Sequence, residues 1–343
     1  MKNHLNVSVI VACRNEEKYI GNCLESIIGN NYPKDRLEVL VVDGMSTDST
    51  RDIIDRYAQN FSFIKRIDNP KLITPAAFNL GIKNASGEVV MIMGSHSKYK
   101  SNYISSCIRY LNKCDADNVG GILRTLPGDD TTTAKAIASS LSHPFGVGNS
   151  SFRVGSRKPL WADTVFGGCY KKKVFDEVGL FNENLVRSQD MDFNIRLKSN
   201  GGKILLVPSI IAEYFAKPTI KSFFMHNFKD GFWAIYPLKF GSSMFKIRHL
   251  LPLFFVTSII AGFVLSFIWL PLKILFLSGI FAYLLLNLFS SAALAWRSKK
   301  LRFFIILPFV FVARHFGYGL GSLWGLLKLT ISSHQPDLAT NTK

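Results

Sequence analysis

The sequence has few acidic residues, and its C-terminal third has almost none. Lysine and arginine together number 41 against 24 aspartates and glutamates, which gives a formal net charge of +17. After Phe245 the only acidic residue is Asp337, and long apolar runs take over. Basic residues flank these runs, which is typical where lysine and arginine stay on the cytoplasmic side of a membrane and meet anionic lipid. Nucleic acid is disfavoured as the anionic partner, because no nucleic-acid-binding motif is present.

The sequence also lacks the motifs of several other protein classes. Its five cysteines form no CxxC pair and are odd in number, so we expect buried thiols in a reducing compartment rather than a disulfide framework. A GxGxxG fingerprint and a P-loop are both missing, which disfavours a dinucleotide site and a P-loop nucleotide site. No signal peptide precedes the first apolar run, and the N-terminal part is therefore expected to remain in the cytoplasm.

Apolar runs alternate with helical patterns along the first hundred residues. Strands are predicted at 7–11, 37–42, 63–67 and 89–93, with helices between them. This alternation predicts an α/β fold with a mostly parallel sheet and helices on both faces. Ligands bind at the carboxyl ends of strands in such sheets. Asp43 and Gly94-Ser95-His96 follow the second and fourth strands, so they fall where a ligand is expected.

The middle of the chain is less regular. Residues 125–161 are rich in glycine, serine and threonine, and we expect them to form a mobile, substrate-facing segment. A strand at 165–170, a helix that begins near Asp190 and a strand at 204–207 follow. Residues 217–246 mix aromatic side chains with lysines, which suits an amphipathic stretch on a membrane surface.

Three apolar runs make up the C-terminal part. Those at 250–270 and 272–296 are each long enough to cross a bilayer, and Pro271 between them predicts a tight hairpin or one broken element. The third run, 303–327, carries Arg314 and His315 near its middle. Ionisable groups at that depth usually face protein or water, so this run is either a simple span or a re-entrant or tilted helix packed against the others.

Two segments near the N-terminus resemble the opening of family 2 glycosyltransferases. They are 7–17, VSVIVACRNEE, and 39–50, VLVVDGMSTDST. Enzymes of this family have the Rossmann-like GT-A fold and transfer a sugar from a nucleotide diphosphate donor with inversion. The resemblance covers about the first 215 residues. The chain is similar to the membrane-anchored enzymes of exopolysaccharide and succinoglycan assembly, for which 248–252, RHLLP, and 314–319, RHFGYG, also match. The Gln-x-x-Arg-Trp motif of processive synthases is missing, which argues against a long-chain polymerase.

The resemblance implies a set of donor-binding residues. Asp43 would accept hydrogen bonds from the base or ribose of the donor, as a carboxylate at a strand end can. The other residues expected around the donor are Ala12, Arg14, Glu16, Ser95 and His96. From the residues alone, Asp43-Gly44 is equally a tight turn at the end of a strand.

The expected metal site departs from the family pattern. The family usually places Asp-x-Asp after the fourth strand to hold a divalent cation, whereas this chain has Gly94-Ser95-His96. Mg²⁺ prefers oxygen ligands, and Mn²⁺ tolerates nitrogen better. His96 is therefore either a metal or pyrophosphate contact or a plain loop histidine, and dependence on Mn²⁺ or Mg²⁺ is left open. Lys98, Lys100 or Arg153 would be alternative partners for the phosphates.

The catalytic base implied by the resemblance is Asp190. It lies in 188–197, SQDMDFNIRL, which matches the acidic motif of the family at a helix start. Inverting transfer needs one carboxylate to take the proton of the acceptor hydroxyl; the alternative is a helix-start acid that satisfies free backbone donors. Asp163, Gly167 and Gly168, in the segment before it, are expected near the sugar or acceptor, although the glycines are equally packing residues.

These features together predict a membrane-anchored glycosyltransferase. The expected parts are a GT-A catalytic domain over 1–215, an interfacial segment over 216–249, an anchor of two or three helices over 250–330 and a polar tail over 331–343. The expected substrates are a nucleotide-diphospho-sugar donor and a polyprenyl-diphosphate-linked glycan at the cytoplasmic face of the cell membrane. The alternative, which Gly94 motivates, is a non-catalytic subunit that kept the fold.

Overall fold

The computed structural model describes residues 4–242 and 247–331. The chain divides into two compact units, each described here by itself. The sheet unit lies within Met1–Arg124 and Gly155–Tyr214, and the helical unit lies within Thr125–Val154 and Phe215–Gln335. The chain therefore leaves the sheet unit, contributes a segment to the helical unit, and returns before it leaves for the second time.

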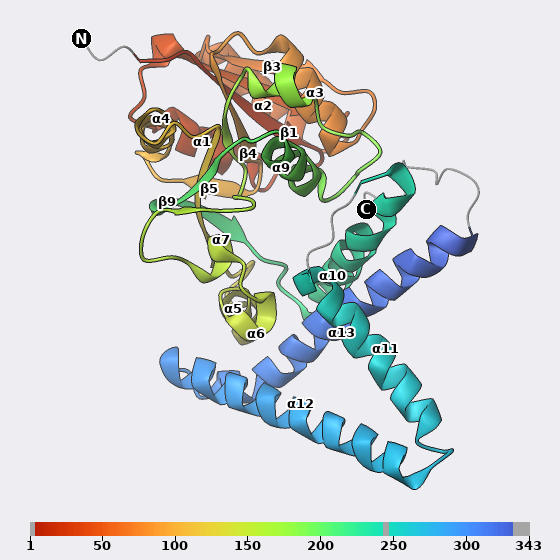
Figure 1. Cartoon of the computed structure of the whole chain (residues 1–343). Helices are drawn as coiled ribbons and strands as arrows, with labels where there is room; N and C mark the ends of the chain where they lie inside the picture. The colour runs from red at the N-terminus through yellow and green to blue at the C-terminus, as the bar shows by residue number, and fades with distance from the viewer. Residues whose placement is uncertain (1–3, 243–246, 332–343) are drawn as a thin grey trace. The chain divides into compact units, whose positions relative to one another are not determined.

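A mixed sheet forms the core of the sheet unit (Figure 1). Its strands are β1 (Val7–Cys13), β2 (Leu37–Asp43), β3 (Ile64–Asp68), β4 (Val89–Gly94), β5 (Ser97–Tyr99), β6 (Asn118–Leu126), β7 (Leu160–Trp161), β8 (Cys169–Lys171) and β9 (Ile204–Phe215). Their order is β3-β2-β1-β4-β8-β6-β9-β5, and β7 pairs with β9. The first four strands are parallel, and β8 runs antiparallel to β4. The predicted mostly parallel α/β sheet is confirmed.

The helices of the sheet unit each bury one apolar face. They are α1 (Ile20–Ile28), α2 (Thr50–Asn60), α3 (Thr74–Asn84), α4 (Tyr103–Lys113), α8 (Val174–Val178) and α9 (Gln189–Ser199). In α1, Ile20, Cys23, Leu24 and Ile27 are fully buried. Their spacing of three and four residues places them on the same side of a helix, which explains why this sequence packs as a helix on the sheet.

The strand expected at 165–170 is shorter than predicted. Only its end is extended, as β8, and bends occupy the residues before it. Gly167 and Gly168 have positive φ angles of 66° and 127°. A Cβ on Gly167 would lie 2.4 Å from the Ile92 carbonyl oxygen, and one on Gly168 would lie 2.4 Å from the Tyr170 ring. The protein's own atoms therefore account for both glycines, because no other residue fits this backbone path.

The helical unit combines a short segment from the middle of the chain, Thr125–Val154, with the C-terminal apolar helices (Figure 1). Its helices are α5 (Thr132–Ser140), α6 (Pro144–Val147), α7 (Ser151–Val154), α10 (Ile220–Ile235), α11 (Ile247–Leu265), α12 (Leu270–Arg297) and α13 (Arg302–Ile331), with the 3₁₀ helix η2 (Tyr236–Phe240). Pro271 lies in the first turn of α12, where a proline costs no hydrogen bond. Of the two alternatives at this junction, the structure has the tight hairpin, formed by α11 and α12.

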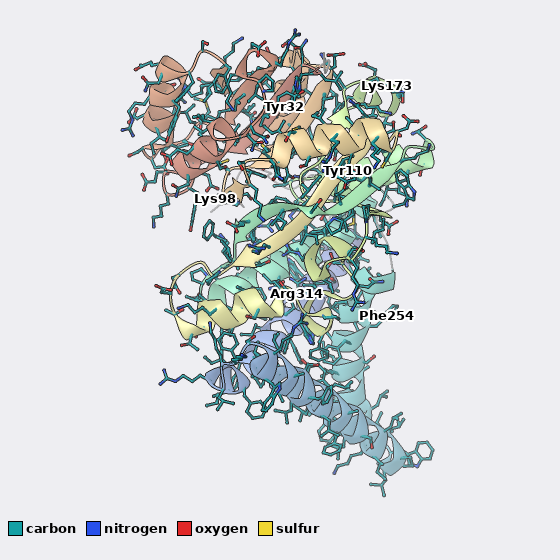
Figure 2. The ribbon with its side chains drawn as sticks, turned by 90° about the vertical axis from the view of Figure 1, so that its left-hand side faces the viewer. Tyr32, Lys98, Tyr110, Lys173, Phe254 and Arg314 are labelled. Carbon is teal, nitrogen blue, oxygen red and sulfur yellow. The ribbon has the colours of Figure 1, made fainter. Side chains whose placement is uncertain are left out.

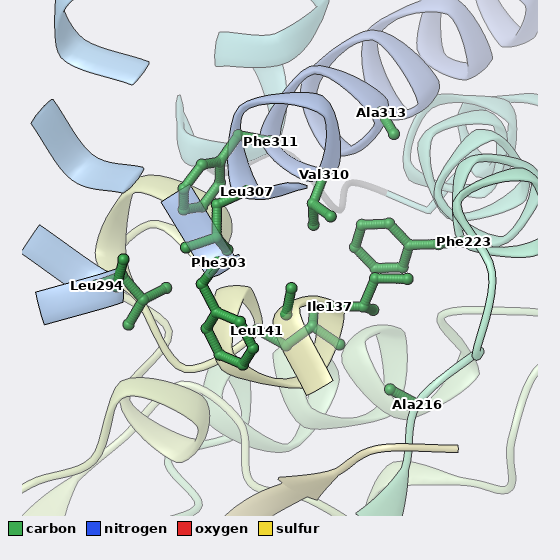
Figure 3. Close-up of a cluster of buried hydrophobic side chains, with 12 residues drawn as sticks. Ile137, Leu141, Ala216, Phe223, Leu294, Phe303, Leu307, Val310, Phe311 and Ala313 are labelled. Carbon is green, nitrogen blue, oxygen red and sulfur yellow. The ribbon is translucent and has the colours of Figure 1, made fainter. Parts of the chain in front are cut away.

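A buried apolar cluster holds the helical unit together (Figure 3). Ile137 and Leu141 of the segment Thr125–Val154 pack in it with Phe303 and Leu307 of α13 and with Leu294 of α12. The expectation of an irregular, mobile segment over 125–161 is therefore wrong for its first part, which contains α5 and contributes to this core. The glycines and serines there allow close packing as well as mobility, and their partners in α13 are far away in the sequence.

Helices α10 and α13 pack with their backbones in contact. A Cβ on Gly321 would lie 2.0 Å from the Phe228 carbonyl oxygen, and one on Gly231 would lie 2.0 Å from that of Tyr318. Gly317 and Gly325, one turn to either side of Gly321, also face the backbone of α10. Small residues at this spacing are typical of helix pairs in membranes. Most of the stretch that we expected to lie on a membrane surface forms α10, which packs against α13.

Among the residues that the structure describes, two helices are long and apolar enough to cross a membrane, namely α12 and α13, and the apolar part of α11 is shorter. They differ in how much of their apolar surface the protein covers. In the most apolar window, 6% of the residues of α12 are buried inside the protein, against 39% of those of α13. Helix α12 therefore presents its side chains outward, whereas α13 is the central helix of the unit.

Candidate active site

The carboxyl ends of three parallel strands lie side by side. The register pairs Cys13 of β1 with Asp43 of β2, and it pairs Ala12 of β1 with Gly94 of β4. Because the strands are parallel and in step, the loops that follow them leave from the same edge of the sheet. The residues expected around a donor therefore gather at this edge, although they come from positions about 30 and 80 residues apart along the chain.

Asp43 is fully buried, and the turn that follows β2 engages both of its carboxylate oxygens. The Ser46 hydroxyl donates to Oδ1 at 2.5 Å, and the Ser46 backbone N–H donates to Oδ2 at 3.0 Å. Arg51 Nη1 lies 3.6 Å from Oδ2. These contacts show that Asp43 shapes the turn after β2. A direct contact between Asp43 and a donor stays a prediction.

The loops after β1 and β2 are joined by hydrogen bonds. The backbone N–H of Asn15 donates to Ser46 Oγ at 2.9 Å, and the backbone N–H of Thr47 donates to Asn15 Oδ1 at 2.9 Å. Arg14 packs over Gly44, where an added Cβ would lie 3.2 Å from the Arg14 Cβ. The two loops therefore form one fixed surface, and Asn15 and Ser46 are structural contributors that sequence reasoning did not single out.

Glu16 and His96 form an ion pair across the ends of β1 and β4. His96 Nδ1 lies 2.8 Å from Glu16 Oε1, and the histidine side chain is 42% exposed. The rings of Tyr19 and Tyr214 flank the imidazole edge-on, at centroid distances of 6.1 Å and 6.0 Å. A carboxylate only accepts hydrogen bonds, so Nδ1 carries the proton, and Nε2 is the nitrogen that remains for a ligand. Sequence reasoning named both residues but not their pairing.

The surroundings of Gly94 leave little room for a longer side chain in this arrangement. An added Cβ would lie 3.2 Å from Ser97 Oγ and 3.6 Å from the Phe166 ring. Within residues 4–242 and 247–331, no group of three or more His, Cys, Asp or Glu side chains could hold a metal ion. Glu16 and His96 are engaged with each other at this edge, so a divalent cation here would take further ligands from the donor.

Asp190 lies in the first turn of α9. Ser188, just before it, has a left-handed backbone with φ of 61°, which starts the helix abruptly. Burial, and then the charge of Asp190, raise the pKa of the Tyr170 phenol. The Tyr170 hydroxyl donates to Asn194 Oδ1 of α9 at 3.3 Å. Gln189 Oε1 is buried and has no hydrogen-bond partner in the part of the chain that the structure describes. Such a group calls for a partner, and sequence reasoning gave Gln189 no role.

Contacts link the start of α9 to the end of β4. The Tyr170 hydroxyl donates to the Gly167 carbonyl at 3.4 Å, and the Ile92 N–H donates to the Gly168 carbonyl at 2.9 Å. Tyr170 and the glycines before it therefore connect α9 to the C-terminal part of β4, the strand that His96 follows. Within α9, Asp192 Oδ2 lies 3.0 Å from Arg196 Nε.

Asp163 lies at the start of this linking segment. Its Oδ1 is 2.9 Å from Lys198 Nζ, and both side chains are 44% exposed. A surface ion pair of this kind contributes little to stability, so the carboxylate is accessible to a ligand at low cost. A contact between Asp163 and a sugar hydroxyl stays a prediction.

The fold has a clear counterpart among solved structures. It matches a mannosyltransferase of Pyrobaculum calidifontis, solved in complex with GDP-mannose and Mn²⁺, with a TM-score of 0.61 at 17% sequence identity. The match covers 94% of this chain and 88% of that chain. At this identity the likeness concerns the fold alone, and it confirms the predicted GT-A architecture.

Sequence relatives extend the likeness to function. The chain is 32% identical over 274 residues to the dolichyl N-acetyl-alpha-D-glucosaminyl phosphate 3-beta-D-2,3-diacetamido-2,3-dideoxy-beta-D-glucuronosyltransferase of Methanococcus voltae, covering 77% of this chain and 84% of the relative. It is 25% identical to the succinoglycan biosynthesis protein ExoA of Rhizobium meliloti, covering 71% of this chain and 74% of that protein. The family model "Glycosyl transferase family 2" matches residues 8–179. The chain is therefore a member of glycosyltransferase family 2, an enzyme family that transfers sugars from nucleotide donors.

Proposed function

We propose that this chain moves one sugar from a nucleotide-diphospho-sugar onto a lipid-linked saccharide, with inversion, at the cytoplasmic face of the cell membrane. The product would enter an exopolysaccharide or another surface glycan. Two observations support a lipid-linked acceptor. The relative from Methanococcus voltae is named for a sugar carried on dolichyl phosphate, and two helices of this chain are apolar and long enough to cross a membrane.

The donor site that we propose is the edge of the sheet where β1, β2 and β4 end. The nucleotide would be surrounded by the backbone at Ala12 and Ser95 and by the side chains of Arg14 and Glu16. Asp43 would hold the turn after β2 in place through its bonds to Ser46. His96 would direct Nε2 at the pyrophosphate, because Glu16 occupies Nδ1. The proposed steps are written for the side chains of this chain, and a divalent cation on the pyrophosphate would supply further positive charge there.

The proposed base is Asp190. It takes the proton from the acceptor hydroxyl while the acceptor oxygen bonds to the anomeric carbon. The bond from that carbon to the donor phosphate breaks on the opposite face, and the nucleoside diphosphate leaves with the electron pair. The segment that we place next to the base contains Asp163, Gly167 and Gly168. The glycines keep this segment close to β4, and Asp163 would bind a sugar hydroxyl.

The observation that supports the proposal is that Asp190 lies in the first turn of α9, the helix that Tyr170 of β8 contacts through Asn194 and Phe193, and that β8 pairs with β4. We expect Asp190→Asn to lower kcat by about two to four orders of magnitude, because it removes the base. The affinity for the nucleotide donor should be unchanged. The assay follows transfer from radiolabelled nucleotide sugars to a prenyl-phosphate-linked sugar, with and without Mn²⁺.

Asp192→Asn is the matched control. Asp192 lies in the same turn of the helix but pairs with Arg196. This variant should therefore lower the melting temperature while changing kcat only slightly. Full activity in Asp190→Asn would remove Asp190 from the mechanism.

Gly94 supports a second candidate function, a subunit that binds nucleotide sugars without catalysis. The family pattern has an acid where this chain has Gly94, and the contacts of Ser97 and Phe166 leave little room for one. The two functions differ in one measurement. A non-catalytic subunit would bind the donor with the same affinity in wild type and Asp190→Asn and would turn over in neither.

A further inference from the structure

Arg314 is a charged residue in the middle of α13, the apolar central helix of the helical unit (Figure 2). Its Nε donates to the Gly146 carbonyl of α6 at 2.8 Å, and its Nη1 donates to the side-chain oxygen of Asn227 on α10. Next to it, His315 Nε2 lies 2.7 Å from the Phe145 carbonyl oxygen of α6. These two polar side chains are therefore directed at other helices of the unit.

Two helices with charged side chains cover the inner side of α13. Helix α5 packs against its first turns in the buried apolar cluster, and α10 packs against its later turns along the glycines described above. Lys135 of α5 pairs with Asp130 at 2.9 Å, and Asp230 of α10 lies 3.4 Å from His226. If α13 crossed a bilayer, it would draw these charged groups into the hydrocarbon, which is costly.

The other side of α13 is apolar and exposed. Ile305 is 70% exposed and Phe309 is 64% exposed, and Leu327 and Ile331 near the end of the helix are exposed as well. At about 100° per residue, these four side chains lie within about a quarter of the helix circumference. Arg314 follows Ile305 by nine residues, about two and a half turns, so it points to the opposite side. We call the side of Ile305, Phe309, Leu327 and Ile331 the outer face.

The α11–α12 hairpin contacts α13 on this outer face. The ring centroids of Phe255 on α11 and Phe316 on α13 are 5.5 Å apart. Phe316 follows Phe309 by seven residues, about two turns, so it belongs to the outer face. Phe254, next to Phe255, is 59% exposed (Figure 2), and most side chains of α12 are exposed too. The outer face and the hairpin therefore form one continuous apolar surface.

Basic side chains stand near both ends of the outer face. Arg302 begins α13, and near its end Lys328 Nζ lies 5.5 Å from the centroid of the Trp324 ring. Among the residues that the structure describes, no acidic residue follows Asp230. Lysine, arginine and tryptophan gather where a membrane meets water, and anionic headgroups attract the basic side chains. A lipid surface therefore matches the outer face in both charge and apolar character.

We propose that α13 lies along the cytoplasmic surface of the membrane, with its outer face in the lipid, and does not cross the bilayer. Length and hydropathy alone would allow it to cross, but the charged helices on its inner side oppose this. Both ends of α13 then stay on the cytoplasmic side, and Arg314 lies outside the hydrocarbon. The inference rests on the proposed function only for the cytoplasmic placement.

The first test measures the accessibility of cysteines at the two ends of α13 in sealed right-side-out membrane vesicles. Leu301→Cys and Lys328→Cys are each made together with Cys114→Ser, because the other native cysteines are buried. We expect a membrane-impermeant maleimide to label both sites only after the vesicles are permeabilised. Labelling of Lys328→Cys alone in sealed vesicles would show that α13 crosses. Labelling of both would place the helix on the outer side of the membrane.

The second test asks whether the outer face touches lipid. Bimane is attached at Phe309→Cys, again with Cys114→Ser, and quenching is measured in phosphatidylcholine vesicles brominated either near the headgroup or near the chain end. We expect stronger quenching by bromine near the headgroup. Lys135→Cys is the matched control and should not be quenched, because α5 lies on the inner side of α13.

Two results of the quenching measurement would overturn the proposal. Absence of quenching at Phe309→Cys would show that water or a second copy of the chain covers the outer face. Stronger quenching by bromine near the chain end would place α13 in the bilayer core. Phe309 is exposed, so its substitution leaves the packing of the unit intact.

Neither test involves a donor, an acceptor or transfer, so both fail separately from the proposed function. If Asp190→Asn abolishes transfer while Lys328→Cys is labelled in sealed vesicles, the catalytic base stands and α13 crosses the membrane. If both tests of α13 give the expected results while Asp190→Asn keeps full activity, the placement of α13 stands and the catalytic base is wrong.

Discussion

Glu16 and His96 are the residues at which the candidate site departs most from a site built on acidic metal ligands. The carboxylate holds Nδ1 of the imidazole at 2.8 Å and thereby sets which nitrogen is presented to a ligand. Tyr19 and Tyr214 restrict the ring from its edges. An oriented imidazole can donate from Nε2 to a phosphate oxygen when that nitrogen carries a proton.

This arrangement predicts that His96 and Glu16 act as a unit in donor binding. We expect His96→Ala to weaken nucleotide-sugar binding by about tenfold or more. Glu16→Ala should cause a loss of similar size, and the double variant should lose little more than either single variant. The measurement is isothermal titration of the nucleotide sugar, first with a chelator and then with Mn²⁺.

The two conditions separate two roles of His96. A loss in both conditions indicates a direct contact with the donor, which is the expected result. A loss only in the presence of Mn²⁺ would identify His96 as a metal ligand. Additive effects of the two substitutions would show that the ion pair is incidental to binding.

At the scale of elements, α10 and α13 approach each other so closely that their backbones are in contact. Gly317, Gly321 and Gly325 recur every four residues and therefore lie on one face of α13. The carbonyl oxygens of α10 approach this face so closely that even a methyl group does not fit beside Gly321. The same contact brings the Asn227 side-chain oxygen to Arg314 Nη1, so this hydrogen bond depends on these glycines.

Gly321→Ala should consequently destabilise the helical unit, by about 1–3 kcal/mol, because the helices must separate to admit the methyl group. Gly279→Ala is the matched control, since Gly279 lies in α12 and an added Cβ there meets nothing within 4 Å. That control should be neutral or stabilising by up to about 1 kcal/mol, from the better helix propensity of alanine. Thermal unfolding in detergent measures both. Equal melting temperatures for the two variants would contradict the close packing.

Elements whose determinants are local were predictable from the sequence. The apolar strand Val7–Cys13 and the helical spacing of Ile20, Cys23 and Ile27 specify their own structure. The strand at 165–170 was predicted too long, because its glycines adopt positive φ angles under contacts from Ile92 and Tyr170. Those contacts come from other parts of the sheet and leave no local signal beyond the glycines themselves.

The same limit applies to the candidate site. Family likeness singled out Asp43, His96 and Asp190, and strand order explains why the first two share an edge of the sheet. The pairing of Glu16 with His96 and the burial of Asp43 under Ser46 depend on side-chain geometry across loops. The hydrogen bonds of Arg314 join α13 to α6 and α10 across 168 and 87 residues, and no spacing pattern reveals such contacts.

At the scale of the whole molecule, charge and apolar surface separate along the chain. The sheet unit carries interspersed charge, whereas α12 carries exposed apolar side chains, among them Leu286 at 58% and Phe289 at 74% exposure. Basic residues fill the turn between α12 and α13. This distribution supports the proposal that α12 lies in a bilayer and that the turn lies on its cytoplasmic side.

Leu286→Arg tests that proposal. A charged residue near the centre of a spanning helix costs about 2.5–3.5 kcal/mol, so this variant should shift protein from the membrane fraction or lower its yield. Leu301→Arg is the control, because Leu301 lies in the basic turn and is 80% exposed. Carbonate-washed membranes analysed by immunoblotting give the measurement. If Leu286→Arg instead raises the soluble yield of folded protein without loss from membranes, α12 does not enter the bilayer.

The interleaving of the two units along the chain has a consequence for synthesis on the ribosome. Ile137 and Leu141 emerge early, yet Phe303 and Leu307, which cover them, are made more than 150 residues later. At typical translation speeds that interval lasts on the order of ten seconds. During this time the nascent sheet can form while the segment that leaves it at residue 125 exposes apolar side chains. The apolar core of the helical unit can therefore form only after α13 has been made. A ribosome that stalls before α13 would release a chain prone to aggregation.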